Sequence, residues 1–435
     1  MANAVFFSTS QPTKSLTALF AAWKAFLLAI ALGAAVGPDY DTSTSLFFER
    51  LYGSHAHVPA LAARLTRWDA LYFMHYARNG YVYEQEWAFG AAMPTVVRGV
   101  LAPFPSWSFG ANAAVEPLVA ITLAHVSHLI AVLALYRLTM VISNDTKLAF
   151  VASALHIISP AGLFLSAPYA ESPFACLSFI GNLLFALGIR NKRDQLKRLA
   201  LVVGAGAIFG LATAFRSNGL SSGVLFVVGA VNCLLAFARR PSLSRLLTLA
   251  APVVGGICVA AGSIMPQFVA WRRYCGASLD DLEPRPWCSR TVPSIYTFVQ
   301  DEYWNVGFLR YWTLNQLPLF LLASPMLTIL LKSGSDIVRD PLRGLRLLKS
   351  GPVEDYRMFV RALAASQLLV AVLAITTYHV QIVSRLSSGY PVWYWWVAGC
   401  LIDKRRQSWG LTIAIFMAMY AGIQGGLFAS FLPPA

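Results

Sequence analysis

The sequence is poor in charged residues. Of its 435 residues, only 12% are charged and 57% are hydrophobic, whereas a soluble globular chain carries about 25% charged residues. Together with a mean hydropathy of +0.58, this composition argues against a water-soluble enzyme. It also excludes a disordered chain, because disorder requires low hydrophobicity and high charge.

Several familiar cofactor motifs are missing as well. The chain has no Walker motif and no dinucleotide fingerprint. None of its Cys and His spacings is typical of a zinc site. We therefore expect no nucleotide cofactor and no resident metal ion.

What the sequence does contain is a series of long apolar runs. Runs near 20 residues can cross a bilayer as helices, whereas a membrane β-barrel would show alternating ten-residue segments. The chain is therefore predicted to be an all-α polytopic membrane protein, with residues 1–435 forming a single integral membrane domain. The eleven predicted spans are 16–37, 117–140, 148–168, 171–190, 199–216, 218–238, 247–270, 313–332, 358–378, 390–402 and 409–432.

The net charge of +14 would suggest a nucleic-acid partner in a soluble protein, but the position of the charges indicates another cause. If the N-terminus is cytosolic, 20 Lys and Arg residues fall on the cytosolic side and 12 on the other. Cytosolic loops of membrane proteins are enriched in these residues. The charge therefore predicts topology, and no nucleic-acid partner is expected.

The same alternation places two large segments on the lumenal side, a first loop at 38–116 and a second loop at 271–312. A third segment, 333–357, is a basic cytosolic loop. Polar chemistry is usually carried by elaborate loops on a rigid scaffold. The active side is therefore expected to be lumenal. Cys275 and Cys288 share the second loop, where an oxidising compartment favours a disulfide over two free thiols.

The first loop holds the most conspicuous polar candidate, Asp69. Apolar and aromatic residues recur around it at helical spacing, namely Leu61, Leu65, Trp68, Tyr72 and Tyr76. This pattern predicts an amphipathic helix in the membrane interface, with Asp69 at headgroup level, where it could meet a lipid-borne substrate. An equally weighted alternative is that Arg67 and Asp69 merely solvate the polar face of such a helix and have no catalytic role.

Further polar candidates lie at predicted lumenal helix ends. Glu171 opens a span, where the helix dipole favours a carboxylate in any case. Arg216 and Asn218 share a tight turn, and Arg385 follows the ninth span. Each arginine could hold a phosphate or merely anchor its helix at the interface. The aromatic run 393–396 is expected to form an interfacial belt.

These segments, taken in order, resemble the GPI mannosyltransferase 2 (PIG-V) family. The resemblance covers about 67–396 and rests on Arg67-Trp68-Asp69-Ala70, Gly80-Tyr81, Glu84, Ser159-Pro160-Ala161, Ser166-Ala167-Pro168-Tyr169-Ala170-Glu171-Ser172, Arg216-Ser217-Asn218-Gly219, Pro286-Trp287-Cys288, Val299-Gln300 with Tyr303-Trp304-Asn305-Val306-Gly307, Gln316-Leu317-Pro318 and His379-Val380-Gln381 with Arg385. One departure is Ala88-Phe89-Gly90-Ala91, where the family pattern has Phe-Pro after Ala-Phe.

The resemblance implies a GT-C type glycosyltransferase of the endoplasmic reticulum, with about 11 transmembrane helices and a large first lumenal loop. It implies dolichyl phosphate mannose as the donor, without a cofactor. The acceptor would be the glycosylphosphatidylinositol precursor, which receives its second mannose in α1,6 linkage. A small membrane-protein partner subunit is also conceivable.

A β-linked donor and an α-linked product require an inverting reaction, which needs one base. We expect Asp69 to be that base, and Arg216 or Arg385 to stabilise the departing phosphate. The expected substrate-binding residues are Arg67, Trp68, Glu84, Glu86, Glu171, Arg216, Asn218 and Arg385. Glu84, Glu86 or Glu171 could instead be the base.

Two other classes of protein remain open at this point. A lipid or solute transporter would place ionisable groups near the middle of its spans, and of the Lys and Arg residues only Lys24 and Arg361 sit well inside the predicted spans. A non-catalytic scaffold subunit would tolerate substitution of Asp69.

Overall fold

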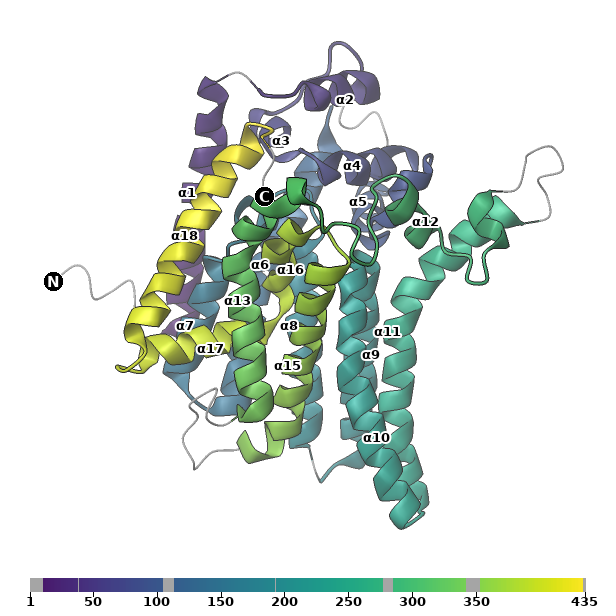
Figure 1. The fold of residues 1–435 in the computed structure, drawn as a ribbon, viewed down its shortest axis with the longest axis vertical. Helices are drawn as coiled ribbons and strands as arrows, with labels where there is room; N and C mark the ends of the chain where they lie inside the picture. The colour runs from purple at the N-terminus through teal and green to yellow at the C-terminus, as the bar shows by residue number, and fades with distance from the viewer. Residues whose placement is uncertain are drawn as a thin grey trace.

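The protein is a bundle of long helices with a layer of short helices at one end (Figure 1). The computed structural model describes residues 11–37, 39–104, 113–191, 193–276, 285–341 and 353–432. Within these ranges it contains no strand, only an isolated bridge between His57 and Ala113. The all-α architecture predicted from the apolar runs is confirmed.

Nine of the described helices are long and apolar enough to cross a membrane, some of them together with an adjoining 3-10 turn. Their α-helical parts are α1 Pro12–Gly33, α6 Val115–Ser143, α8 Glu171–Arg190, α9 Gln195–Phe215, α10 Gly223–Arg239, α11 Leu243–Cys275, α13 Leu317–Arg339, α15 Val353–Thr376 and α18 Gln407–Ala429. Each of them overlaps one predicted span.

The other two predicted spans are short helices of 12 residues, α7 Thr146–Ile157 and α17 Pro391–Ile402. A helix of this length extends only about 18 Å, which is less than the hydrocarbon thickness. The prediction of an uninterrupted span at 148–168 is therefore wrong. Pro160 explains the interruption, because the residue before a proline avoids the α conformation. The two short helices pack against each other.

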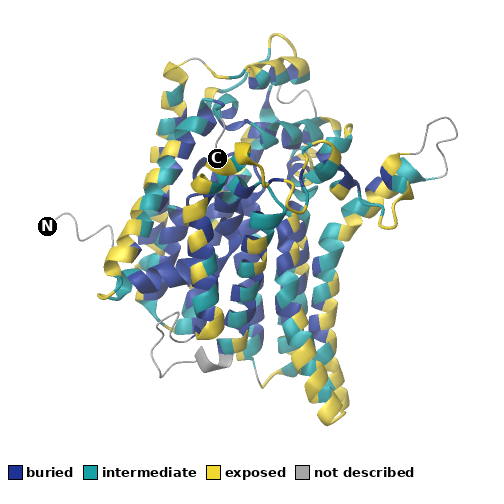
Figure 2. Ribbon diagram, in the orientation of Figure 1, coloured by how far each residue is buried: buried dark blue, intermediate teal, exposed yellow. Residues whose placement is uncertain are grey.

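The aromatic run 393–396 lies in the protein interior (Figure 2), so the expected interfacial belt is wrong. The indole nitrogen of Trp395 donates to the hydroxyl of Thr139 at 2.7 Å, and that of Trp393 donates to the carbonyl of Ser387 at 2.9 Å. Indole groups accept full burial when the N–H finds a partner. These internal partners explain why the run packs inward.

The short helices of the two predicted lumenal loops lie together at the upper end in Figure 1. They are α2 Ser43–Tyr52, α3 Ala60–Leu65, α4 Asp69–Asn79, α5 Ala92–Leu101 and α12 Ile295–Glu302. We call this end of the bundle the loop end. Cys275, at the end of α11, forms a disulfide with Cys288, with a Cα–Cα distance of 5.6 Å. The basic segment 333–357 lies partly outside the described residues.

Candidate active site

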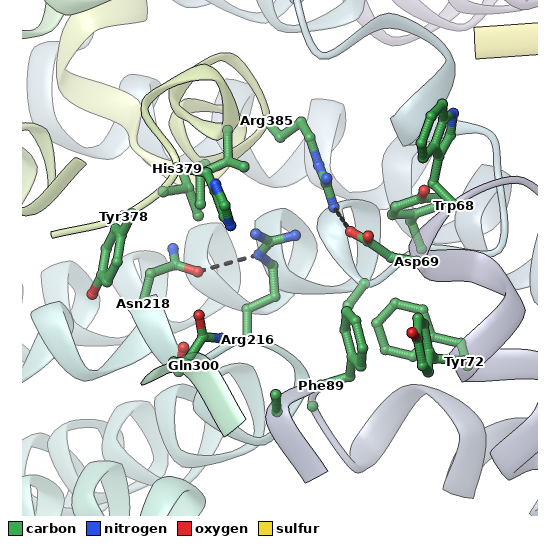
Figure 3. A pocket seen from close by; sticks show the side chains of 18 of the residues that line it. Trp68, Asp69, Tyr72, Phe89, Arg216, Asn218, Gln300, Tyr378, His379 and Arg385 are labelled. Carbon is green, nitrogen blue, oxygen red and sulfur yellow. Dashed lines mark hydrogen bonds and ion pairs between the residues drawn. The ribbon is translucent and has the colours of Figure 1, made fainter. Parts of the chain in front are cut away.

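A cavity of about 560 Å³ opens at the loop end. Trp68, Asp69, Arg216, Asn218 and Arg385 line it, and all five were predicted to be site residues (Figure 3). They come from α4, from the turn after α9 and from the short helix α16 Val383–Leu386. The fold thus brings together polar residues more than 300 positions apart in the sequence.

Asp69 is the first residue of α4, and the residue before it has an unusual backbone conformation. Trp68 adopts a φ of 54° and a ψ of −123°, a region that costs a non-glycine residue of order 1–3 kcal/mol. The predicted amphipathic helix is therefore not continuous, since it ends at Leu65 and restarts at Asp69. Such strain persists only where surrounding contacts impose it.

Contacts with the end of α18 impose this conformation. The ring of Trp68 packs on that of Phe431, with centroids 4.7 Å apart. The guanidinium of Arg67 is buried and donates to the carbonyl of Ala429 at 3.2 Å and to Asp39 at 3.1 Å. Arg67 thus supports the turn before Asp69 from outside the cavity, and the structure gives it no place in the cavity wall.

Asp69, Glu171 and two arginines form a charge network beside the cavity. Arg385 donates from Nε to Oε1 of Glu171 at 2.7 Å, and from Nη2 to Oδ2 of Asp69 at 2.8 Å. Arg216 also pairs with Oε1 of Glu171 through Nη1, and its Nε donates to Asn218 at 3.2 Å. The Glu171 side chain is completely buried. A carboxylate in that position requires charged partners, so Glu171 holds both guanidinium groups in place.

Arg385 is also held by aromatic rings. Its guanidinium lies 4.4 Å from the ring centroid of Phe164 and 4.9 Å from that of Tyr169, which is favourable cation–π geometry. Burial alone would lower the pKa of Arg385, but the carboxylates of Glu171 and Asp69 outweigh it and raise the pKa above its ordinary value. Arg385 is therefore a permanent positive charge at the cavity wall.

Several cavity residues were not assigned to the site from the sequence, namely Tyr296, Gln300, Tyr378 and His379. Burial lowers the pKa of His379, although Asp69 opposes this shift, so the imidazole is neutral near pH 7. Its Nδ1 has no hydrogen-bond partner among the described residues. Gln300 and His379 lie in segments that carry the family resemblance, and this resemblance is the one sequence feature that could have assigned them to the site.

The structure does not bring Glu84 and Glu86 to the cavity. Glu84 accepts hydrogen bonds from Trp287 and from Tyr303, both at 3.3 Å, and so links the first loop to the second. Glu86 is buried and accepts from the backbone N–H groups of Val82 and Tyr83 at 2.7 and 2.9 Å. Both carboxylates therefore stabilise loop structure at a distance from the cavity lining.

Gly90, at the departure from the family pattern, lies against the end of α9. A Cβ atom there would stand 1.9 Å from the carbonyl oxygen of Phe215. Only glycine permits this close approach of the two backbones. The Phe89–Gly90 segment thus forms a cavity wall directly against the helix end that presents Arg216.

A second cavity of about 380 Å³ adjoins the first. The two share lining residues, among them Phe89, Asn218, Tyr296 and Tyr378. The second cavity extends between the spanning helices α9, α11 and α15, where its walls include Pro266, Leu369, Val370 and Leu373. The first cavity thus continues into a second, mostly apolar space among membrane-spanning helices.

Metal-ligating side chains do not cluster in the part of the chain that the structure describes. No group of three or more His, Cys, Asp or Glu residues is placed there to hold a metal ion. The polar groups available at the cavity are the carboxylate of Asp69, the two guanidinium groups and neutral donors. This set can accept a proton and bind an anion.

Comparison with known proteins gives consistent matches along the chain. The family model described as Mannosyltransferase (PIG-V) matches residues 18–435. GPI mannosyltransferase 2 of Gibberella zeae is 62% identical over 428 residues, with 98% of each chain covered. The protein of the same name from Chaetomium globosum is 50% identical over 458 residues, covering 98% of this chain and 97% of the relative.

More distant matches include GPI mannosyltransferase 2 of Schizosaccharomyces pombe, 32% identical over 387 residues, with 85% of this chain and 73% of the relative covered. Among solved structures, the archaeal oligosaccharyltransferase AglB from Archaeoglobus fulgidus aligns with a TM-score of 0.45 at 11% identity, and covers 97% of this chain and 56% of that one. The chain belongs to the PIG-V mannosyltransferase family and is a glycosyltransferase.

Proposed function

We propose that this protein transfers mannose from dolichyl phosphate mannose to the glycosylphosphatidylinositol precursor and adds the second mannose in α1,6 linkage. The observation that carries the proposal is the convergence of Asp69, Arg216 and Arg385 on one cavity that continues into an apolar space. A carboxylate beside cations suits glycosyl transfer from a phosphate. An apolar extension suits a donor whose phosphate carries a long hydrocarbon chain.

Asp69 is the proposed general base. Its Oδ2 accepts from Arg385, whereas Oδ1 accepts no hydrogen bond among the described residues, and a third of the side chain is exposed. Oδ1 can therefore accept the proton of the acceptor hydroxyl. The hydroxyl oxygen bonds to C1 of mannose from the face opposite the phosphate. The C1–O bond to the phosphate breaks, and its electron pair leaves with the phosphate.

Arg216 is the proposed phosphate ligand. Arg385 is engaged by two carboxylates, while Arg216 is engaged by Glu171 and the neutral side chain of Asn218. Because only one carboxylate neutralises Arg216, it is the better placed of the two arginines to bind a second anion. The leaving phosphate gains negative charge as its bond to C1 breaks, and a prepositioned guanidinium stabilises that charge. Arg385 then orients Asp69.

Glu171 has a positioning role in this scheme. Its complete burial and its two guanidinium partners keep it away from an acceptor hydroxyl. Glu171 thereby fixes the distance between the proposed base and the proposed phosphate site, because Arg385 reaches Asp69 and Arg216 faces the cavity. This geometry favours Asp69 over Glu171 as the base.

We further propose that the reaction takes place at the lumenal face of the endoplasmic reticulum membrane, with a cytosolic N-terminus. The excess of Lys and Arg in the loops opposite the cavity supports this orientation. In this scheme the partners are two lipid-linked substrates and, as a further proposal, a small membrane-protein subunit. No cofactor is needed, because the donor is already activated by its phosphate.

The test is transfer by purified protein in nanodiscs, with labelled dolichyl phosphate mannose and a synthetic acceptor that carries one mannose. The expected product has two mannoses and loses the second to an α1,6-specific mannosidase. GDP-mannose, supplied alone as the donor, should give no product. Transfer from GDP-mannose only, or a product with another linkage, would contradict the proposal.

A further inference from the structure

Residues 159–170, which we call the buried segment, lie between α7 and α8 and directly precede Glu171, the first residue of α8. The segment is irregular apart from the 3-10 turn η5, Gly162–Leu165, and every residue in it is buried. A backbone without regular helical hydrogen bonds needs other partners where water is excluded. The contacts of this segment therefore determine where the residues around it lie.

The buried segment supports the side chains of the charge network through direct contacts. Phe164 and Tyr169 line the cavity and lie beneath the guanidinium of Arg385. The hydroxyl of Tyr169 donates to the backbone carbonyl of Arg67 at 2.9 Å, two residues before Asp69. A displacement of this segment would thus move Glu171, Arg385 and the turn before Asp69 together.

Lys24 holds the buried segment from the side of α1. Its amino group lies 2.8 Å from the carbonyl oxygen of Leu165 and 2.7 Å from the hydroxyl of Ser166. Only 4% of Lys24 is exposed, and it does not line the cavity. Among the described residues no carboxylate lies within ion-pair distance of it. An ionisable side chain in a membrane span is costly and usually functional.

We propose that Lys24 is a positioning residue for mannosyl transfer, and that its amino group fixes the position of the buried segment relative to α1. This inference rests on the proposed function. The carbonyl of Leu165 also accepts from the hydroxyl of Ser172 at 2.9 Å. This second bond remains without the lysine, so folding does not depend on Lys24 alone. The lysine bonds instead tie the segment to a helix 141 positions away.

The experiment compares wild type with Lys24→Met, which keeps most of the length of the side chain and removes its donors, and with Lys24→Gln, which keeps an N–H donor. The matched control is Leu16→Met, because Leu16 is buried on the same helix and its hydrophobic cluster contains no residue of the buried segment. The measurements in nanodiscs are kcat and KM for both substrates, thermal midpoint, and hydrogen–deuterium exchange of peptides covering 159–171.

Lys24→Met should lower kcat by about 10–100-fold, because a displacement near 1 Å in a catalytic site has effects of this size. KM for both substrates and the thermal midpoint should stay close to wild type, while exchange in 159–171 rises. Lys24→Gln should recover part of the rate, and Leu16→Met should match wild-type kcat. A merely structural role predicts the opposite pattern, with a lower midpoint and an unchanged kcat per folded molecule.

Unchanged kcat and unchanged exchange in Lys24→Met would overturn the inference. If that variant does not fold, Ser166→Ala tests the inference in its place, because it removes one of the two hydrogen bonds of the Lys24 amino group. A several-fold lower kcat and faster exchange of the segment would then support the proposal, and wild-type values would overturn it. Exchange does not require turnover, so failure of the proposed donor or acceptor in wild type is distinguishable from failure of the Lys24 inference.

Discussion

Asp69 and Arg385, 316 positions apart, form an ion pair in which Nη2 lies 2.8 Å from Oδ2. The same arginine donates through Nε to the buried Glu171. The base proposed here is therefore oriented by a cation that is itself held in place by a second carboxylate. This arrangement leaves Oδ1 of Asp69 without a hydrogen-bond partner among the described residues, as the proposed role requires.

Asp69→Asn should reduce mannose transfer by about 10²–10⁴-fold, the usual contribution of general-base assistance. The amide keeps the shape of the side chain and its contact with Arg385, so protein level should be unchanged. The measurement is transfer in microsomes from cells that express each variant at matched levels, where the precursor should stop at the one-mannose stage. Glu302→Gln, in an exposed carboxylate of α12, is the control. Near-normal transfer by Asp69→Asn would exclude Asp69 as the base.

Arg216→Ala should reduce kcat by about 10²–10³-fold, as is typical when one donor to a developing anion is removed. Arg216→Lys keeps the charge and loses the fork of parallel N–H groups, so its defect should be smaller. Both variants are compared in the nanodisc assay at saturating donor. Equal defects in the two variants would argue against contact with the phosphate.

Glu171→Gln should destabilise the protein by about 3–5 kcal/mol, because it leaves two guanidinium groups near a buried site without their shared carboxylate. Glu84→Gln should leave kcat close to wild type, since Glu84 bonds to Trp287 and Tyr303 away from the cavity. Thermal midpoints in detergent and kcat in nanodiscs separate the two variants. A strong loss of kcat in a stable Glu84→Gln would return Glu84 to the list of candidate bases.

Acid should destabilise the protein through His379. Burial lowers the pKa of His379 from its ordinary value of 6.5, so below about pH 6.5 the unfolded state binds more protons than the folded state. The free energy of unfolding therefore falls as the pH decreases from 6.5 toward the lowered pKa. His379→Gln should show a flatter dependence of the thermal midpoint between pH 5 and 7, and the exposed His55→Gln should retain the wild-type slope. Identical slopes in all three proteins would refute this account.

Asn144-Asp145-Thr146, the single Asn-x-Ser/Thr sequon of the chain, should remain unglycosylated because it is predicted to face the cytosol. In the structure Asn144 ends α6 and Asp145 caps α7, with Oδ1 accepting from Lys147 and Leu148. Endoglycosidase treatment of the protein in isolated microsomes should leave its electrophoretic mobility unchanged. A shift in mobility would overturn the predicted topology.

Length and hydropathy were sufficient to predict the long helices, because an 18-residue apolar stretch has one stable arrangement across a bilayer. They did not reveal the break after α7 or the inward packing of the run 393–396. Both depend on internal partners that hydropathy does not report, such as Thr139 for the indole of Trp395.

The candidate site was predictable to the extent that its residues sit at helix ends on one side of the membrane, as Asp69, Glu171, Arg216 and Arg385 do. Glu86 lies outside the cavity lining, because its spacing from Tyr83 is that of a capping box, in which the carboxylate satisfies backbone donors. His379 was not assigned to the site, because its place in the cavity wall depends on its packing beside residues distant in sequence. The strained conformation of Trp68 has no sequence signal at all.

The contacts of Arg67 and Trp68 with Ala429 and Phe431 bear on the biogenesis of the enzyme. During synthesis the segment around Asp69 emerges early, yet Ala429, which supports it, is translated 362 positions after Arg67. The turn before Asp69, the proposed base, thus lacks its support until α18 has entered the membrane. Chains that stop short of this helix would be catalytically silent, so the capacity to transfer mannose is acquired only when insertion is complete.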